Sequence, residues 1–342
     1  MSAQTTAQWQ ENARRILPPQ VWEYLQHVAD GGTEAASQAW DKLALYPAIL
    51  RGVQSVRTDA TILGVDVALP VLTTPNGRAT RYHPDGELAV LQGAAKAGTI
   101  AVLPSSVIDS TPELARRVPT ARWWQQLYVT HDRALMADRM AMLRAAGCRA
   151  LVLTADLLPD GRPAPPPPPP AEWETIATGM GEPMFTGAGL DDLAWLAAHA
   201  AMPVIVKGVL RADDARLCLA NGADAIIVSN HGGNQLSGAI DTATALRPVI
   251  EGCGPHTVLV DGGIRNGTSV LKALAMGAAG VLVGRPTSHA LAVSGADGVH
   301  DLLCSLGSEL ARAMTLCGVA STTSVAGASL LSAGDKCRST PT

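Results

Sequence analysis

The sequence predicts an α/β fold in which a single (β/α)8 barrel follows a helical N-terminal extension. Three observations lead to this fold class. Eight short apolar runs recur between residues 70 and 286, and amphipathic stretches separate them. The runs are nearly continuous in Val, Ile and Leu, as in parallel strands that are buried on both faces. The alternative, an open doubly wound sheet, would carry a GxGxxG turn after its first strand, and no such turn follows the first run.

The predicted elements follow one another regularly along the chain. Helical patterns lie between the strands, for example at residues 134–146 and at 212–221, where Asn221-Gly222 forms a typical helix stop. We expect residues 1–60 to form the helical extension, 61–295 the barrel, and 296–342 closing helices and a tail. The strands are expected at residues 70–75, 99–105, 123–129, 150–156, 203–209, 225–230, 257–263 and 280–286.

The loop after the fourth predicted strand is unusual because residues 163–170 read PAPPPPPP. Such a run adopts a stiff polyproline conformation. We interpret it as a rigid spacer in a shortened loop, and a ligand for an SH3-type domain is the alternative.

The composition excludes several classes of protein. Apolar residues make up 47% of the chain and charged residues 16%, which excludes a disordered chain. The net charge of −4 comes without a dense basic stripe, so no nucleic-acid partner is expected. No apolar run of 18 residues and no signal-peptide pattern appears, so no membrane partner is expected. The six cysteines form no CxxC pair, and we expect reduced thiols in a cytoplasmic protein.

Polar side chains mark the ends of the predicted strands, where barrel enzymes carry out their chemistry. His231 lies in the segment SNHGG at the end of the sixth strand, and its glycines permit close backbone approach. Asp156, which ends the fourth strand, could hold the imidazole in one tautomer and stabilise its cation. The other polar strand ends are Asn76, Ser105, Gln126, Tyr128, Thr154, Lys207, Ser229, Asp261, Arg265 and Arg285.

The last two strand ends indicate a phosphate site. DGGIRNG (261–267) and GRP (284–286) are glycine-rich turns that each contain one Arg, and these loops hold phosphate in many barrels. The alternatives are tight turning alone or a sugar-phosphate enzyme. Lys207 lies within VIVKG, and a buried Lys needs an anionic or electron-rich partner such as a flavin ring.

Taken together, these motifs resemble the FMN-dependent 2-hydroxy acid oxidase and dehydrogenase family. The likeness extends in order over nearly the whole chain. It is carried by LPPQVWEYL (17–25), TILG (61–64), HPDGELAV (83–90), QLYVTHDR (126–133), LTAD (153–156), VIVKGVL (204–210), VSNHGGNQL (228–236) and the stretch from DGGIR to GRP (261–286).

The resemblance implies FMN as cofactor and a tetramer-like homo-oligomer. It implies His231 as the catalytic base, Asp156 as its acidic partner, and Tyr24 and Tyr128 as tyrosines that face the substrate. The residues implied for FMN are Pro75, Asn76, Gly77, Ser105, Gln126, Thr154, Lys207, Ser229, Asp261, Gly263, Arg265, Gly284 and Arg285.

Two departures from the family pattern concern the substrate carboxylate. The family has a carboxylate-binding Arg after SNHGG, where this chain has Asn234. A second Arg is expected in the loop after Asp156, where Pro163 stands and Arg162 matches the preceding position. Each charge-assisted hydrogen bond contributes roughly 1.5–3 kcal/mol, so the loss of both weakens carboxylate binding by orders of magnitude.

Further departures concern the turns and the lid. The family's PTA turn is PNG here, and Pro104 stands where a serine is usual. Only 51 positions separate Asp156 from Lys207, so the loop that covers the substrate in relatives is shortened.

We therefore expect an FMN-dependent oxidoreductase that acts on a small molecule. A hydroxyl proton would pass to His231 while hydride moves from carbon to flavin N5. The substrate would be larger or otherwise non-standard, in a biosynthetic pathway, and would contact Tyr24, Tyr128, His231, Asn234 and Arg162. One alternative is an ordinary 2-hydroxy acid oxidase or dehydrogenase whose carboxylate clamp has moved to Arg162 or Arg122. The others are a non-redox flavin isomerase and a non-catalytic flavin-binding barrel.

Overall fold

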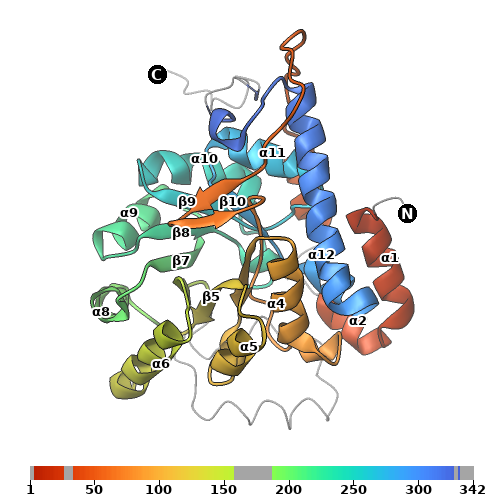
Figure 1. Cartoon of the computed structure of the whole chain (residues 1–342). Coiled ribbons are helices and arrows are strands. Elements are labelled where there is room, and N and C mark those ends of the chain that lie inside the picture. The colour runs from red at the N-terminus through yellow and green to blue at the C-terminus, as the bar shows by residue number, and fades with distance from the viewer. Residues whose placement is uncertain (1–3, 27–33, 158–186, 327–329, 332–342) are drawn as a thin grey trace.

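Eight parallel strands close into a barrel, as the sequence predicts (Figure 1). The computed structural model describes residues 4–26, 34–157, 187–326 and 330–331. Around the barrel the strands follow the order β10-β3-β4-β5-β6-β7-β8-β9. They are β3 (Val71–Thr73), β4 (Ile100–Leu103), β5 (Arg122–Leu127), β6 (Leu151–Thr154), β7 (Val204–Val209), β8 (Ala225–Val228), β9 (Thr257–Val260) and β10 (Gly280–Val283).

The inside of the barrel is filled by alternate residues of these strands. Leu72, Val102, Trp124 and Ile227 belong to this inner cluster, and each is almost completely buried. The neighbouring residues on each strand point outwards into the larger cluster beneath the helices. Both faces of most strands are therefore apolar, which explains the nearly continuous Val, Ile and Leu runs; β5 differs, because it contains the buried Gln125 and Gln126.

A hairpin that was not predicted from the sequence closes the amino end of the barrel. It consists of β1 (Ala60–Ile62) and β2 (Val65–Val67), which pair antiparallel. Leu63 and Gly64 join them with positive φ angles of 47° and 75°, the backbone that a tight type I′ turn requires. Ile62 is fully buried in the inner cluster, so the hairpin seals the end of the barrel that faces away from the carboxyl ends of the strands.

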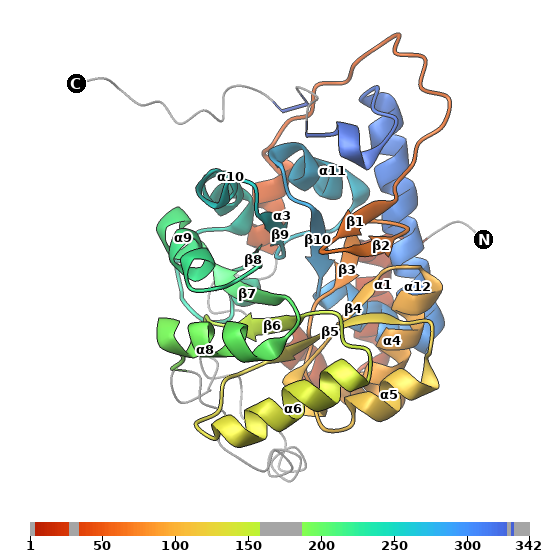
Figure 2. The ribbon, with the colours of Figure 1, turned by 60° about the vertical axis from the view of Figure 1, so that its left-hand side comes forward.

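Helices alternate with the strands and cover the outside of the barrel (Figures 1 and 2). Several begin on a capping side chain directly after a loop: Asp132 accepts a hydrogen bond from the backbone of Leu135, and Asn266 accepts one from Ser269. The outer helices are α4 (Gly86–Lys96), α5 (Thr111–Arg117), α6 (Arg133–Ala145), α8 (Leu190–Ala200), α9 (Ala212–Ala220), α10 (Thr242–Cys253) and α11 (Gly267–Met276).

The N-terminal extension is helical over only part of the range expected from sequence. Its helices are α1 (Thr6–Ile16), α2 (Pro19–Gln26) and α3 (Glu34–Asp41), and residues 42–59 contain no helix. Trp40 of α3 donates from its indole nitrogen to the carbonyl of Gly262 at 2.8 Å. Thr6 of α1 donates to the carbonyl of Arg265 at 2.6 Å. The extension is thus bound to the loop after β9, at the carboxyl end of the barrel.

The helical segment that follows β10 is divided in two. Helix α12 (Arg285–Leu316) starts directly after β10, and the boundary expected between the barrel and the closing helices, 295/296, lies at a break within it. Ser294 and Gly295 interrupt its helical backbone, and Gly295 has a φ of 55°. A side chain at Gly295 would lie 2.9 Å from the ring of His83, so the interruption allows the two to pack closely.

Some expectations concern parts of the chain outside the described residues. These include Arg162, Pro163 and the prolines at 165–170. Five cysteines are described, all as free thiols, and Cys148, Cys253 and Cys317 are buried. Over the described ranges, no helix combines the length and apolar composition needed to cross a membrane.

Candidate active site

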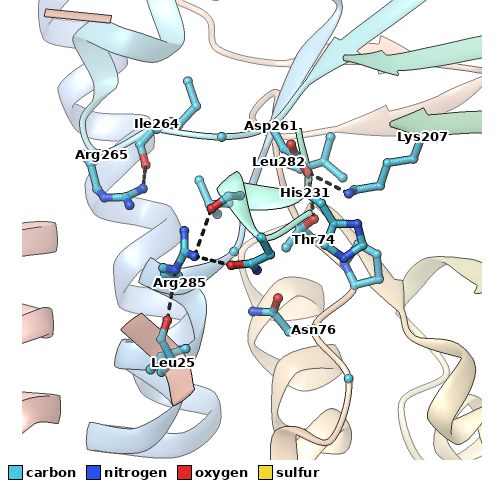
Figure 3. A pocket seen from close by; sticks show the side chains of 18 of the residues that line it. Leu25, Thr74, Asn76, Lys207, His231, Asp261, Ile264, Arg265, Leu282 and Arg285 are labelled. Carbon is cyan, nitrogen blue, oxygen red and sulfur yellow. Dashed lines mark hydrogen bonds and ion pairs between the residues drawn. The ribbon is translucent and has the colours of Figure 1, made fainter. Parts of the chain in front are cut away.

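A pocket opens at the carboxyl ends of the strands, between the barrel and helix α2 (Figure 3). It receives side chains from the loops after β3, β8, β9 and β10 and from α2. Residues expected from sequence that line it are Tyr24, Pro75, Asn76, Gly77, Lys207, His231, Asn234, Asp261, Gly263, Arg265, Gly284 and Arg285.

His231 and Asp156 form a hydrogen-bonded pair between the ends of β8 and β6. His231 Nδ1 lies 3.0 Å from Asp156 Oδ1. The side chains are 27% and 15% exposed, so the pair is largely shielded but open on the imidazole side. His231 has a φ of 55°, a left-handed backbone that few side chains adopt and that directs the imidazole into the pocket. Its backbone nitrogen donates to Ser229 Oγ at 3.1 Å.

The carboxylate of Asp156 stays ionised despite its burial. Burial alone raises its pKa, but the hydrogen bond with His231 and the positive charge of Lys207 outweigh this and bring the pKa below its ordinary value. An ionised Asp156 accepts a hydrogen bond from His231 Nδ1–H, and the other ring nitrogen is then a hydrogen-bond acceptor.

Gly208 makes room for this carboxylate. It has a φ of 110°, and a Cβ at this position would lie 2.5 Å from Asp156 Cγ. The register between β7 and β8 shifts between Lys207 and Val209, so Gly208 bulges at the point where Asp156 lies. Any larger residue would push Asp156 away from His231.

Lys207 is the buried cation of the site. Its Nζ donates to Ser229 Oγ at 2.9 Å and lies 3.3 Å from Asp261 Oδ2. Burial lowers the pKa of Lys207, but the carboxylates of Asp261 and Asp156 more than compensate, so the pKa is raised and the amine stays charged. Ser229 contacts both Lys207 and the backbone of His231, and so links the cation to the base.

Two arginines mark the other end of the pocket. Arg285 donates to the carbonyls of Leu25 and Gly232, both at 3.0 Å, and to Asn234 Oδ1 at 3.3 Å (Figure 3). Burial, followed by the charge of Arg285, lowers the pKa of Arg265 to about 10. Within the described ranges no carboxylate pairs with Arg265, so this end of the pocket suits an anion such as a phosphate.

The loop after β9 brings backbone close to this anion site. Gly263 has a φ of 75°, and a Cβ there would lie 2.2 Å from the carbonyl oxygen of Ala36 in α3. Glycine is therefore required where the DGGIR turn meets the N-terminal extension.

Several predicted residues lie at the strand ends beside the pocket without lining it. Gln126 accepts at Oε1 from the backbone of Ser105 at 2.9 Å. Burial and the charge of Asp156 raise the pKa of Tyr128 to about 12, so its phenol remains protonated. The predicted site residues that do not line the pocket are Ser105, Gln126, Tyr128, Thr154, Asp156 and Ser229.

The buried polar atoms around the pocket fit a polar ring system such as a flavin. Gln126 Nε2, Asp261 Oδ1 and Asp156 Oδ2 are buried and have no hydrogen-bond partner among the described residues. Buried polar atoms are nearly always satisfied, so such a set indicates a bound group. Lys207 lies at one end of the site and Arg265 at the other. The site therefore offers a cation for the ring of the predicted FMN and a second cation for its phosphate.

The structure contradicts one alternative for the carboxylate clamp. Arg122 is the first residue of β5 and is exposed at the amino end of the barrel, opposite the pocket. Asn234 faces the pocket, but its side-chain oxygen is bound to Arg285.

Sequence reasoning missed Tyr82 and His289. Tyr82 is buried and lines the pocket. His289 of α12 is buried, stacks on Trp22 with ring centroids 5.6 Å apart, and lies 3.1 Å from the side-chain nitrogen of Gln26. The aromatic residues in the segment QVWEYL of α2 could have marked one partner of His289. The contact itself joins segments far apart in the sequence, so no local pattern predicts it.

His289 is expected to make folding stability depend on pH. Burial, then the charges of Arg265 and Arg285, lower its pKa from 6.5 to about 3. Below pH 6.5 the unfolded chain therefore takes up a proton that the native protein does not, and stability falls by up to about 1.4 kcal/mol per pH unit towards pH 3. We expect His289→Phe to remove this part of the pH dependence, as measured by denaturant unfolding at pH 7, 5.5 and 4.5. Equal pH dependence in the two proteins would contradict the assignment.

Comparisons with known proteins find similarity over most of the chain. The sequence profile of a family described as FMN-dependent dehydrogenase matches residues 13–166 and 168–332. Glycolate oxidase 1 of Zea mays is 34% identical, with 98% of this chain and 97% of the relative covered. 2-Hydroxyacid oxidase 1 of Mus musculus is 32% identical, with 91% of each covered. A crystal structure of mandelate oxidase with benzoyl-formic acid superposes with a TM-score of 0.83 at 35% identity, and 94% of this chain and 96% of that chain are covered.

Proposed function

The chain belongs to the FMN-dependent dehydrogenase family, and we propose that this FMN oxidoreductase acting on CH–OH groups uses His231 as the base that takes the hydroxyl proton of its substrate. The observation that carries the proposal is the 3.0 Å contact between His231 and Asp156 at the edge of the pocket, with the charged Lys207 close by. This arrangement is what a general base needs: an accepting ring nitrogen and a carboxylate that stabilises the cation formed.

In this proposal the side chains of the site together accept one proton, that of the substrate hydroxyl. Asp156 holds His231 Nδ1–H, so the second ring nitrogen accepts the substrate proton. The imidazolium that forms is stabilised by the same carboxylate, which the charge of Lys207 helps to keep ionised. FMN supplies the acceptor for the hydride that leaves the substrate carbon. Ser229 binds both the backbone of His231 and Lys207, and so fixes the position of the base relative to the cofactor site.

FMN would be held along the whole pocket. Lys207, Gln126 and Ser105 would contact the ring, and Asp261 would contact the sugar-like chain. Arg265 and Arg285, with the glycine backbones of Gly263 and Gly284, would hold the phosphate.

Lys207→Met should cause loss of FMN. The substitution removes the cation and leaves Asp261 buried without its ion-pair partner, which destabilises the fold by about 3–5 kcal/mol. We expect most of the purified variant to lack flavin, measured as visible flavin absorbance relative to protein absorbance. Lys207→Met combined with Asp261→Asn is expected to recover stability but not FMN. Full flavin content in the double variant would contradict a role of Lys207 in cofactor binding.

For the substrate, we propose a hydroxy compound larger than glycolate or lactate. The relatives are named for oxidation of glycolate, 2-hydroxy acids and mandelate. Where the family pattern has a carboxylate-binding Arg after SNHGG, this chain has Asn234, whose side chain binds Arg285 and adds no charge of its own. A biosynthetic role and a non-standard substrate would follow from this difference and from the short proline-rich segment after Asp156.

The direct test is anaerobic stopped-flow reduction of the bound flavin by a panel of hydroxyl compounds. The panel includes glycolate, lactate, mandelate and bulkier hydroxy acids, with an ester of each. We expect the bulky compounds to reduce the flavin fastest. Fast reduction by glycolate or lactate would instead support an ordinary 2-hydroxy acid oxidase, and no reduction by any compound would favour a flavin isomerase or a binding protein.

A further inference from the structure

A buried lysine outside the pocket contacts the N-terminal extension. Lys272 of α11 is buried, and its Nζ donates to the carbonyl of Trp40 at 2.8 Å. Trp40 lies in the last turn of α3, where a cation interacts favourably with the carbonyl groups that a helix leaves unpaired. Burying a lysine costs free energy of desolvation, so this contact indicates that the end of α3 is held in a defined position.

Trp40 extends this contact to the loop after β9. Its indole Nε1 donates to the carbonyl of Gly262 at 2.8 Å, and its side chain is fully buried. Thr242 Oγ1 donates to the same carbonyl at the longer distance of 3.3 Å. Two successive hydrogen bonds therefore connect Lys272, through Trp40, with a glycine that lines the pocket.

The hydrogen bond from Trp40 fixes the direction of one peptide unit. The carbonyl of Gly262 and the N–H of Gly263 belong to the same planar, trans peptide, so they point in opposite directions. Gly262 and Gly263 both line the pocket, whereas Trp40 does not. Because its carbonyl faces Trp40, this peptide directs its N–H away from α3 and towards the pocket.

The N–H of Gly263 is available to a bound group. It donates to no other residue in the part of the chain that the structure describes. A Cβ on Gly263 would lie 2.8 Å from Trp40 Cδ1, so the turn packs directly against the indole ring. Arg265 follows two residues later and lines the same pocket. A backbone donor next to a guanidinium group suits an anion.

We infer that Trp40 and Lys272 are positioning residues of the cofactor site. The Trp40 indole turns the peptide between Gly262 and Gly263 so that its N–H donates to the phosphate of FMN, and Lys272 holds Trp40 in place. Both side chains act through the backbone of the loop and do not contact the cofactor themselves. The inference rests on the proposed function, which places the FMN phosphate beside Arg265 and Gly263.

The test compares two flavins that differ in the phosphate alone. The holoenzyme is dialysed to equilibrium against mixtures of FMN and riboflavin, and the bound flavins are released and quantified by chromatography. The measured quantity is the preference for FMN over riboflavin. A residue that orients a phosphate donor changes this preference, whereas a purely structural residue weakens the binding of both flavins and leaves the preference unchanged.

We expect Trp40→Phe to lower the preference for FMN about 10-fold, because it keeps an aromatic ring but removes the N–H that orients the peptide. Lys272→Met acts one contact further away and is expected to lower the preference about 3-fold. The total flavin content shows whether each variant is folded. If Trp40→Phe retains neither flavin, Lys272→Met decides by the same measurement.

Each variant has a matched control. Trp9→Phe removes another buried indole N–H, but Trp9 Nε1 has no hydrogen-bond partner among the described residues. Lys96→Met changes the net charge as Lys272→Met does, at an exposed position on α4. Both controls should show the wild-type preference for FMN.

The outcomes separate this inference from the proposed function. An unchanged preference in Trp40→Phe and Lys272→Met, or an equal loss in the two controls, would overturn the inference. If Arg265→Met lowers the preference and Trp40→Phe does not, the phosphate lies where we propose and only the positioning role is wrong. If neither of these two variants lowers it, the proposed placement of the phosphate fails as well. The role of His231 is tested independently, by reduction of the flavin.

Discussion

Replacing His231 by Asn is expected to slow reduction of the flavin by substrate about 10²- to 10⁴-fold, the usual contribution of a general base. Asn is chosen because the φ of His231 is 55° and Asn tolerates this left-handed backbone better than Ala does. The amide cannot take up a proton at neutral pH, so the hydroxyl proton has no acceptor. FMN should remain bound, because Lys207, Arg265 and Arg285 are unchanged.

The rate is measured by anaerobic stopped-flow absorbance with the best substrate of the panel. His199→Asn serves as the control, since His199 is exposed on α8, where its hydrogen bond and its ring contact are both to Trp195. We expect the control to reduce its flavin at the wild-type rate. Complete anaerobic bleaching of the His231→Asn enzyme at the wild-type rate would rule out His231 as the base.

Gly208→Ala should disable the same chemistry without altering any group that reacts. The new Cβ would meet Asp156 Cγ at 2.5 Å, so the carboxylate must leave its position 3.0 Å from His231. His231 then loses the group that sets its tautomer and stabilises its cation. We expect flavin reduction to slow by about 10²-fold, because the base itself is still present.

The matched control is Gly147→Ala. Gly147 has a φ of 93°, close to the 110° of Gly208, but a Cβ there has no neighbour within 4 Å. Both variants should lose about 1–3 kcal/mol of stability from the strained backbone, measured by denaturant unfolding. Only Gly208→Ala should lose catalysis. Equal rates in the two variants would show that the space beside Asp156 is not what Gly208 provides.

The barrel strands and their polar ends were predictable because the sequence pattern of each βα unit lies within a short stretch of the chain. The runs ALVLTAD and AIIVSN place Asp156 and His231 at strand ends, and the closure of a parallel barrel brings all such ends to one rim. Capping residues such as Asp132 and Asn266 accept hydrogen bonds from backbone nitrogens three residues along the chain. The positions where these helices begin are therefore also encoded locally.

Other features could not be predicted in this way, because they depend on contacts between distant segments. The hairpin β1–β2 is short, and only its burial under the barrel stabilises it. The last helix of the extension ends at Asp41 rather than near residue 60, and its Trp40 is bound to the distant loop after β9.

The sequence alone determined the fold class and the candidate base of this protein, because strand periodicity and strand-end motifs are short-range signals. The cofactor followed from the resemblance of those motifs to a known family. The tertiary structure decided what surrounds them. It showed that Gly208 makes space for Asp156, that Asn234 is bound to Arg285, and that Arg81 lies over Tyr24. The last contact joins residues 57 positions apart, on α2 and on the loop after β3. No local spacing encodes such a meeting, since it follows from how the extension packs on the barrel.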